Sequence, residues 1–502
     1  MNNLAKAIMF LGSGSDVGKS VAAAAFCRIL KRRGFKPAPF KAQNMSNNSF
    51  VTVEGGEIGR AQVVQAEACG LPPSSDMNPI LLKPTSQMGA QIVLQGQVKG
   101  QMKAAEYHGR KKEFVGAVME SYHRLAGQFE IIVMEGAGSC CELNLKENDL
   151  VNFSMAQRVN APCVLVADID RGGVFAQTIG SFLLMTPAEK KMLAGFLINK
   201  FRGDPDLFVS GREIIEKKSG RPVFGVVPFF DHIHIDPEDS VAVQADRRSI
   251  APTRPDRINA AVIHLPGISN FTDMEALERE PDVLVNYLAR PQNLGEYDLV
   301  VLPGSKCTLD DAAWLARTGW VDPIREYARN KGRVVGICGG FQIMGREVTD
   351  PHGVESSLGR VDGLGLLPAA TIMEGDKVLR RVVGTDLLTG RKISGYEIHM
   401  GRTVIDGEGG PFLRLHAPGD SRTWEDGWTL GEGRILGSYV HGLFDSPGWR
   451  LYFLNNIRRE KFLPEKKKSA PSRGGRFHQY DLLADHYERH VDVDGILKLL
   501  GV

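Results

Sequence analysis

The stretch LGSGSDVGKS, residues 11–20, combines the residue types of a phosphate-binding loop. Gly12 and Gly18 are separated by five residues, one more than in the common G-x-x-x-x-G-K-[ST] pattern. An apolar run at 7–11 precedes the loop and an alanine-rich helical pattern at 19–34 follows it, which is the context that phosphate loops require. Backbone N–H groups of the turn and the helix N-terminus would face an anion. The stretch therefore predicts a site for the phosphates of a nucleotide.

Lys19, Ser20 and Glu135 are the side chains with which this loop would act on ATP and Mg²⁺. Lys19 would reach the outer phosphates, and the Ser20 hydroxyl would bind the metal ion. Glu135 follows an apolar run at 131–134, in VMEGAG, where a carboxylate can hold Mg²⁺ directly or through water. The alternative is that both motifs are structural turns, one before an ordinary helix and one after an ordinary strand.

The lengthened loop resembles that of the dethiobiotin synthetases, which use ATP to activate a carboxylate. The EGAG segment at 135–138 fits the same pattern, and Lys41 in FKAQN matches its second lysine near the phosphates. Partition-type ATPases carry a further lysine at the place of Gly14, so the resemblance to them is weaker. The loop and this resemblance together imply a nucleotide site and a metal site. The nucleotide site would consist of Gly12, Asp16, Gly18, Lys19, Ser20 and Lys41, and Ser20 and Glu135 would bind the metal ion.

A second set of reactive residues lies in the other half of the chain. VVGICGGFQIMG, residues 334–345, puts Cys338 at a sharp turn between an apolar strand and an amphipathic segment, where a helix N-terminus favours thiolate. His441 follows another strand in SYVHGLF, and VLPGS at 301–305 ends a third strand in a glycine turn. A lone cysteine in such a turn would usually be structural. Cysteine, histidine and a backbone-rich loop together are the parts of an acyl-transfer site.

These motifs resemble a class I glutamine amidotransferase. The resemblance implies that Cys338 attacks the glutamine amide, that His441 is the general base, and that the Gly339 N–H and one from the PGS turn form the oxyanion hole. Class I enzymes usually follow the histidine with Pro-Glu, whereas Gly and Leu follow it here. The candidates for a third member are Asp445 and Glu397, and a Cys–His dyad is the alternative.

The elements that must position these residues form two α/β units. Short apolar runs alternate with helical patterns through the first half, which favours a mainly parallel sheet covered on both faces. The fold class is therefore α/β, with a P-loop, dethiobiotin synthetase-like parallel-sheet domain followed by a class I glutamine amidotransferase-like domain. We expect a synthetase domain at 1–236, a proline-rich and charged linker at 237–257, an amidotransferase domain at 258–447 and a helical tail at 448–502.

Composition limits the setting in which the chain works. It has 502 residues, 43% hydrophobic and 24% charged, with a net charge of +2, so no strong field draws it to nucleic acid or membrane. Seven cysteines without C-x-x-C spacing indicate a reducing compartment, so we expect a cytoplasmic protein. DHIHID at 231–236 is interpreted as an exposed strand or loop rather than a metal site. The oligomeric state, a homo-oligomer included, stays open.

Longer stretches resemble the cobyric acid synthase family in collinear order over nearly the whole chain. They include FKAQNMSNNS at 40–49, DMNPILLKP at 76–84, ISNFTD at 268–273 and GYEIHMGRT at 395–403. KAQNMSNNS is specific, since the related cobyrinic acid a,c-diamide synthases do not carry it. The resemblance implies ATP- and glutamine-dependent amidation of carboxylates b, d, e and g of a corrinoid, adenosylcobyrinic acid a,c-diamide. The amide-rich residues 43–48 would hold corrin side chains, or else only shape the nucleotide site.

Two other functions fit parts of the pattern. One is a glutamine-dependent ligase for another polycarboxylate, either cobyrinic acid a,c-diamide synthase-like or acting on a cell-wall precursor. The other is a nucleotide switch joined to an inactive binding module, against which the intact Cys338 and His441 argue.

Overall fold

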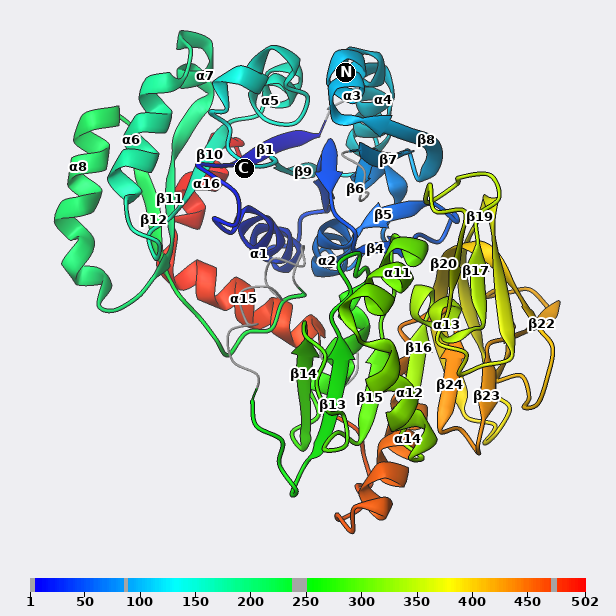
Figure 1. Cartoon of the computed structure of the whole chain (residues 1–502). Helices are drawn as coiled ribbons and strands as arrows, with labels where there is room; N and C mark the ends of the chain where they lie inside the picture. Colours follow the sequence, from blue (N-terminus) through cyan, green and yellow to red (C-terminus); the bar gives the residue numbers. More distant parts are fainter. Residues whose placement is uncertain (1–4, 85–88, 237–250, 471–475) are drawn as a thin grey trace.

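Two six-stranded sheets, one in each half of the chain, form the frame of the molecule (Figure 1). The computed structural model describes residues 5–84, 89–236, 251–470 and 476–502. The predicted linker at 237–257 lies for the most part outside these ranges, and its described part, 251–257, has no helix or strand.

The first sheet has the order β12-β11-β10-β1-β9-β2, and all its neighbours are parallel. Its strands read as apolar runs because both faces are buried. In β1, Ile8 and Phe10 face one core, together with α1, whereas Met9 and Leu11 face another, together with α4 and α5. The predicted parallel sheet with two covered faces is confirmed. The bounds are β1 Lys6–Gly12, α1 Lys19–Arg32, β2 Pro37–Phe40, α4 Val115–Ala126, β9 Ile131–Glu135, α5 Phe153–Val159, β10 Cys163–Asp168, β11 Leu193–Phe201 and β12 Val223–Pro228.

The second sheet has the order β14-β13-β15-β16-β24-β23, parallel except for its edge strand β23. The apolar run 435–440 reads as one strand but is split. Tyr439 turns its N–H to the carboxylate of Asp426, and the next two residues, β25, join β20 of another sheet. The bounds are β13 Ile258–Ile263, β14 Val283–Leu288, β15 Leu299–Leu302, α11 Thr308–Thr318, α12 Val321–Arg329, β16 Val334–Ile337, α13 Gly339–Met344, β23 Trp428–Leu430, β24 Ile435–Ser438 and β25 Val440–His441.

A largely antiparallel sheet flanks the second half and reaches back to the first (Figure 1). Its long hairpin, β19 and β20, touches the first half where Lys377 Nζ lies 2.6 Å from Glu57 and where Tyr396 packs edge-on against Phe50. The pattern of apolar runs and helical stretches in the sequence did not predict this sheet. The bounds are β17 Glu347–Thr349, β18 Arg360–Asp362, β19 Ala369–Asp386, β20 Lys392–Ile405, β21 Leu413–His416 and β22 Thr423–Asp426.

Small elements of the first half lie outside its six-stranded sheet, and β4 and β5 among them contact the second half through Phe50 and Glu57. The bounds are β3 Gln43–Met45, β4 Ser49–Val51, β5 Glu57–Gly59, α2 Arg60–Ala68, β6 Ile80–Pro84, β7 Gly89–Leu94 and β8 Gln97–Lys103. The other helices are α3 Ala104–Arg110, α6 Val174–Leu184, α7 Pro187–Met192, α8 Val209–Ser219 and α10 Glu275–Glu278.

The C-terminal helices divide between the two halves. α14, Pro447–Glu460, packs in the core of the second sheet through Trp449, Phe453 and Leu454. α15, Arg476–His490, and α16, Val493–Leu499, return to the core of the first sheet. The residues predicted as a helical tail are therefore helical and belong to two cores.

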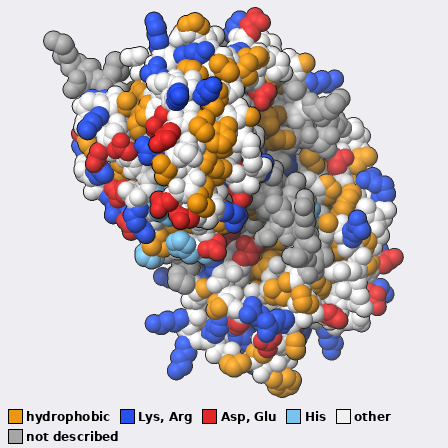
Figure 2. Space-filling view, turned by 90° about the vertical axis from the view of Figure 1, so that its left-hand side faces the viewer, with side chains coloured by type: hydrophobic (Ala, Val, Ile, Leu, Met, Phe, Trp, Pro, Cys, Tyr) orange, Lys and Arg blue, Asp and Glu red, His pale blue; other side chains and the backbone are white. Residues whose placement is uncertain are grey.

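The surface carries mixed charge. On the face shown in Figure 2, acidic and basic side chains alternate with hydrophobic ones. DHIHID at 231–236, predicted as a strand or a loop, is a loop in which Ile233 is buried and His232 is exposed. Over the described residues no group of three or more His, Cys, Asp and Glu could hold a metal ion, and no helix has the length and apolarity needed to cross a membrane.

Candidate active site

The predicted phosphate loop lies between β1 and α1 at the carboxyl edge of the first sheet (Figure 1). Gly18 caps the helix with φ of 96°, and a Cβ there would lie 2.1 Å from the Asn199 amide nitrogen. A Cβ on Gly12 would meet the Lys19 ammonium at 2.7 Å. Both positions therefore require glycine, the first for its backbone conformation and both for space.

The Lys19 ammonium lies inside this loop. Its Nζ donates to the carbonyls of Gly14 and Gly138, at 2.8 and 3.0 Å, so it joins the loop to the EGAG segment. Asp16, at the outer turn with φ of 57°, pairs with Arg171 at 3.6 Å. Asp16 is thus on the rim of the loop, whereas Lys19 is at its centre.

Ser20, Lys41 and Glu135 meet at the end of β9. Glu135 Oε1 accepts from the Ser20 hydroxyl at 2.7 Å and from Lys41 Nζ at 2.8 Å, and its Oε2 accepts from Gln65 at 2.6 Å. Glu135 and Lys41 are almost fully buried. A hydroxyl beside a single carboxylate suits Mg²⁺, which completes its shell with phosphate oxygens and water. The predicted nucleotide and metal residues are therefore brought together.

Cys338 occupies a strained elbow between β16 and α13. Its φ of 51° and ψ of −109° are rare for a residue with a side chain, and such strain is typical of nucleophile elbows. A Cβ on Gly340 would lie 2.0 Å from the Leu302 carbonyl, and one on Gly339 would lie 2.8 Å from the Ser305 nitrogen. The small residues thus let the elbow approach the PGS turn, as the sequence predicted.

His441 pairs with Asp273, which the sequence did not indicate as a catalytic residue. His441 Nδ1 lies 2.7 Å from Asp273 Oδ2, and the other carboxylate oxygen accepts from the Gly442 N–H at 2.7 Å. Asp273 is in a 3₁₀ turn, η6 Phe271–Met274. Burial opposes protonation of His441, but the charges of Asp273 and Cys338 outweigh it and raise its pKa to about 10. Cys338, His441 and Asp273 therefore have the arrangement expected of a Cys–His–Asp triad.

Asp273, rather than either of the two candidate third members, lies against Nδ1 of His441. Glu397 lies on β20 and pairs with Arg380, because its strand register turns it away from the histidine. Asp445 ends the turn after His441, and its N–H donates to the carbonyl of Gly442.

The hollow beside Cys338 is lined by charged side chains from both halves. Lys83 comes from the first half, and Lys306, Glu355 and Lys377 come from the second. Burial raises the pKa of Glu355 to about 7 and lowers that of Lys377 to about 7. Basic and acidic side chains in one hollow suit an amino acid, whose α-amino and α-carboxylate groups carry opposite charges.

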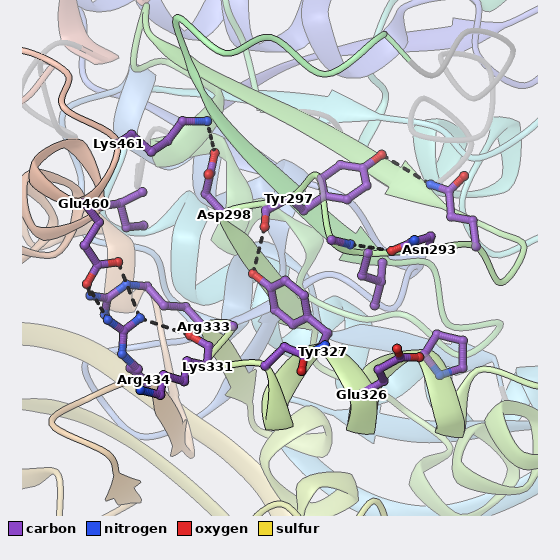
Figure 3. A pocket seen from close by; sticks show the side chains of 17 residues that line it. Asn293, Tyr297, Asp298, Glu326, Tyr327, Lys331, Arg333, Arg434, Glu460 and Lys461 are labelled. Atoms are coloured by element: carbon purple, nitrogen blue, oxygen red, sulfur yellow. Dashed lines mark hydrogen bonds and ion pairs between the residues drawn. The ribbon is translucent and has the colours of Figure 1, made fainter.

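A larger cavity, of about 540 Å³, lies at the opposite, amino edge of the second sheet (Figure 3). Several of its charged side chains form ion pairs with one another. Arg333 and Arg434 share Glu460 at 2.7 Å each, and Lys461 lies 2.7 Å from Asp298. No residue predicted from the sequence as a site residue lines this cavity.

Known proteins match both halves of the chain. Residues 8–242 match the CobQ/CobB/MinD/ParA nucleotide binding domain, and residues 259–449 match the CobB/CobQ-like glutamine amidotransferase domain. A cobyric acid synthase of Syntrophobacter fumaroxidans is 50% identical over 99% of both chains. The chain belongs to the cobyric acid synthase family. Further relatives of that name are from Chlorobium phaeobacteroides, 43% identical over 100% of this chain and 99% of the relative, and Clostridium acetobutylicum, 42% identical over 99% of both.

Membership in the cobyric acid synthase family makes this chain a ligase with a glutamine amidotransferase domain, and its pathway is cobalamin biosynthesis. It confirms the predicted family and fold class. Asp273 was present in the sequence as the last residue of ISNFTD, a stretch noted for its resemblance to the same family. Its pairing with His441 spans 168 residues, and no spacing rule connects the two.

Proposed function

We propose that this enzyme uses ATP and glutamine to amidate carboxylates b, d, e and g of adenosylcobyrinic acid a,c-diamide, giving adenosylcobyric acid. One observation carries the proposal. A phosphate loop with Lys19 and Glu135 and a triad with Cys338 lie in a single chain that is related over its whole length to cobyric acid synthases. KAQNMSNNS favours this substrate over other polycarboxylates.

The first half would activate the carboxylate. A carboxylate is a poor electrophile, and transfer of the γ-phosphoryl group from ATP to its oxygen gives an acyl phosphate and ADP. Ammonia then attacks the acyl carbon and phosphate leaves. Lys19 is suited to hold the outer phosphates, and Ser20 and Glu135 are suited to hold Mg²⁺, which neutralises charge on the transferred group.

The second half would release that ammonia from glutamine. Cys338 attacks the side-chain amide carbon, and His441 first takes the thiol proton and then gives it to the leaving ammonia. Asp273 holds the ring by Nδ1 and so leaves Nε2 for this work. A water molecule, deprotonated by His441, then hydrolyses the thioester to glutamate.

The direct test is incubation of the purified protein with ATP, Mg²⁺, glutamine and adenosylcobyrinic acid a,c-diamide. Mass spectrometry should record four successive acid-to-amide conversions, and glutamate should form with each. Cobyrinic acid and a cell-wall lipid precursor serve as competing acceptors. Preferential amidation of either of these would replace the proposed substrate, and absence of amidation with every acceptor would refute a ligase function.

A further inference from the structure

The amino-edge cavity, which is the one of about 540 Å³ at the start of the strands of the second sheet, has no part in the proposed chemistry. Three parallel strands begin beside it, since Asp298 precedes β15, Arg333 precedes β16 and Arg434 precedes β24. Cys338 follows the other end of β16, so the whole strand separates the nucleophile from this cavity. Its volume is within the usual range of sites for small molecules.

Arg333 has a pairing edge in this cavity of which only half is used. Its side chain is buried, with 8% exposure. Nη2 donates to Glu460 Oε1 at 2.7 Å, whereas Nε, the other donor of the same edge, is buried and has no hydrogen-bond partner in the part of the chain that the structure describes. A guanidinium group pairs best with an oxyanion that takes both donors at once. Because a buried unpaired donor costs free energy, this edge favours a second acceptor oxygen.

A second guanidinium group competes for the same carboxylate oxygen. Arg434 Nη2 donates to Glu460 Oε1, also at 2.7 Å, and Arg434 Nη1 lies 3.4 Å from Oε2. The carbonyl of Lys331 accepts from Nη1 at 3.0 Å and holds this side chain in place. Figure 3 shows the two arginines and the glutamate meeting on one side of the cavity. Two oxygens therefore serve two guanidinium groups, and a phosphate group, with three terminal oxygens, would give each group an oxygen of its own.

Glu460 is the member of this cluster that can leave it. Its side chain is 41% exposed, so it can turn into solvent. It is also the last residue of α14, where the partial negative charge of the helix end disfavours a carboxylate. An anion from solution can therefore take its place and keep both guanidinium groups paired.

The rest of the lining indicates what such an anion carries. The cavity has four basic side chains, from two arginines and two lysines, against the three carboxylates of Asp298, Glu326 and Glu460. Withdrawal of Glu460 leaves an excess of two positive charges, which matches a phosphate monoester near neutral pH. Apolar side chains, among them Leu294 and Ile457, complete the lining and suit an organic group.

We propose that the amino-edge cavity binds a small organic phosphate monoester. The phosphate group takes the place of the Glu460 carboxylate between Arg333 and Arg434, and the organic group lies against Leu294 and Ile457. Binding makes and breaks no covalent bond. This inference does not rest on the proposed function, because it uses none of the residues assigned to either half-reaction.

The test is a calorimetric titration with phenyl phosphate, which joins a phosphate monoester to an apolar ring. It uses the full-length Lys19→Ala protein, in which the phosphate loop lacks its central cation and competes less for the probe. One equivalent should bind saturably. Arg333→Met and Arg434→Met, each in this background, should weaken binding by roughly 10- to 150-fold, because each removes a charged hydrogen-bond donor.

Two further variants separate binding from folding. Arg414→Met is the matched control, because Arg414 also pairs with a glutamate of the second half, Glu425, but lies on β21 outside the cavity. It should keep the affinity of the background protein. Glu460→Gln should tighten binding, because it removes the carboxylate that competes for the two guanidinium groups. Near-ultraviolet circular dichroism checks the fold of each variant, and if Arg333→Met does not fold, Arg434→Met and Glu460→Gln decide.

Two further probes define the class of ligand. Inorganic phosphate should bind about 10-fold more weakly than phenyl phosphate or weaker still, because it leaves the apolar lining uncovered. Benzoate, a carboxylate on the same ring, should also bind more weakly, because its two oxygens have to serve both guanidinium groups. If benzoate binds as tightly as phenyl phosphate, the preference for phosphate is overturned, and equal binding of inorganic phosphate overturns the organic group.

Three results would overturn the site itself. The first is the absence of saturable binding of phenyl phosphate to the Lys19→Ala protein. The second is an affinity that is the same in the Arg333, Arg434 and Arg414 variants. The third is weaker binding in a folded Glu460→Gln variant, because Glu460 would then support the ligand instead of competing with it.

Discussion

At the scale of single residues, His441 is controlled by the carboxylate beneath it. Asp273 and Cys338 overcome the effect of burial and raise the pKa of the histidine to about 10, from the ordinary value of 6.5. A group whose pKa is raised in the folded protein stabilises the fold fully at a pH below its ordinary pKa. That stabilisation is lost as the pH rises through the pKa of the folded state. The imidazolium form of His441 should therefore persist well above neutral pH.

Asp273→Asn should remove most glutaminase activity. The neutral amide lowers the pKa of His441, and it can also stabilise the wrong tautomer, which in a Ser–His–Asp triad costs roughly 10⁴-fold in kcat. The remaining activity should lose its alkaline limb at a lower pH than the unmodified protein. Steady-state rates of glutamate release between pH 6 and about 10 check this. Unchanged rates would mean that Asp273 only fixes the Gly442 turn.

Cys338→Ser separates the two half-reactions. A serine hydroxyl keeps the size of the thiol but lacks the thiolate that makes cysteine nucleophilic near neutral pH. Glutamine should stop serving as nitrogen donor, while ammonium at high concentration should still be incorporated with ATP. This rescue should strengthen as the pH rises and more ammonia is unprotonated. Loss of both donors in a folded variant would give Cys338 an architectural role instead.

Glu135→Gln should weaken the binding of Mg²⁺, so that amidation needs a higher Mg²⁺ concentration. The carboxylate accepts hydrogen bonds from Ser20, Lys41 and Gln65. An amide is a poorer ligand for a hard cation than a carboxylate, and its NH₂ group can only donate, so it cannot accept from these donors. Amidation with ammonium, titrated with Mg²⁺, should require more metal, and basal glutamate release should remain. Glu213→Gln, at an exposed position on α8, is the control that should change neither. If the Mg²⁺ titrations of the two variants are identical, Glu135 does not bind the metal ion and has only a structural role in the turn.

At the scale of elements, the catalytic elbow depends on how closely α13 approaches β15. Gly340→Ala would put a Cβ 2.0 Å from the Leu302 carbonyl, so it should destabilise the protein by about 1–3 kcal/mol and slow glutamate release. A Cβ on Gly180, in the interior of α6, would have no neighbouring atom within 4 Å, so Gly180→Ala should stabilise the protein by about 0.5–1 kcal/mol. Denaturant unfolding compares the two. Equal shifts would show that the elbow has room that the geometry does not provide.

The elements that position the loops were predictable, whereas those that join the halves were not. β1, β9, β15 and β16 are short apolar runs with a glycine or a reactive residue at their ends or within the next two residues, and such runs identify buried parallel strands. β19 mixes charged and apolar residues because it is only partly buried, so its alternation is weak.

The third triad member could not be predicted for a related reason. Asp273 meets His441 only after two separate sheets have formed and β25 has crossed to the hairpin. Local patterns carry no trace of that contact. The sequence offered Asp445, shortly after the histidine, and Glu397, in an earlier stretch that pairs with Arg380 instead.

At the scale of the whole molecule, the chain closes on itself. α14 belongs to the core of the second sheet, and α15 and α16 lie in the core of the first, so the last residues cover the sheet with which the chain began (Figure 1). Arg28 on α1 fixes α15 through two hydrogen bonds to Asp481, at 2.7 and 2.9 Å. The helix that follows the phosphate loop is therefore held by residues more than 400 positions further along the sequence.

Two leucines with no exposed surface provide a matched test of this arrangement. Leu483 on α15 lies in the core with α1, and Leu454 on α14 lies in the core with β13 and β15. Replacement of either by alanine removes the same buried atoms and should cost about 2–5 kcal/mol. Leu483→Ala should speed amide hydrogen exchange in β1 and α1, and Leu454→Ala should speed it in β13 and β15, because local stability follows the core that is damaged. If each variant instead speeds exchange equally in both sheets, the two halves unfold as one cooperative unit. The helices α14, α15 and α16 would then hold the two halves together, and would not stabilise each half independently.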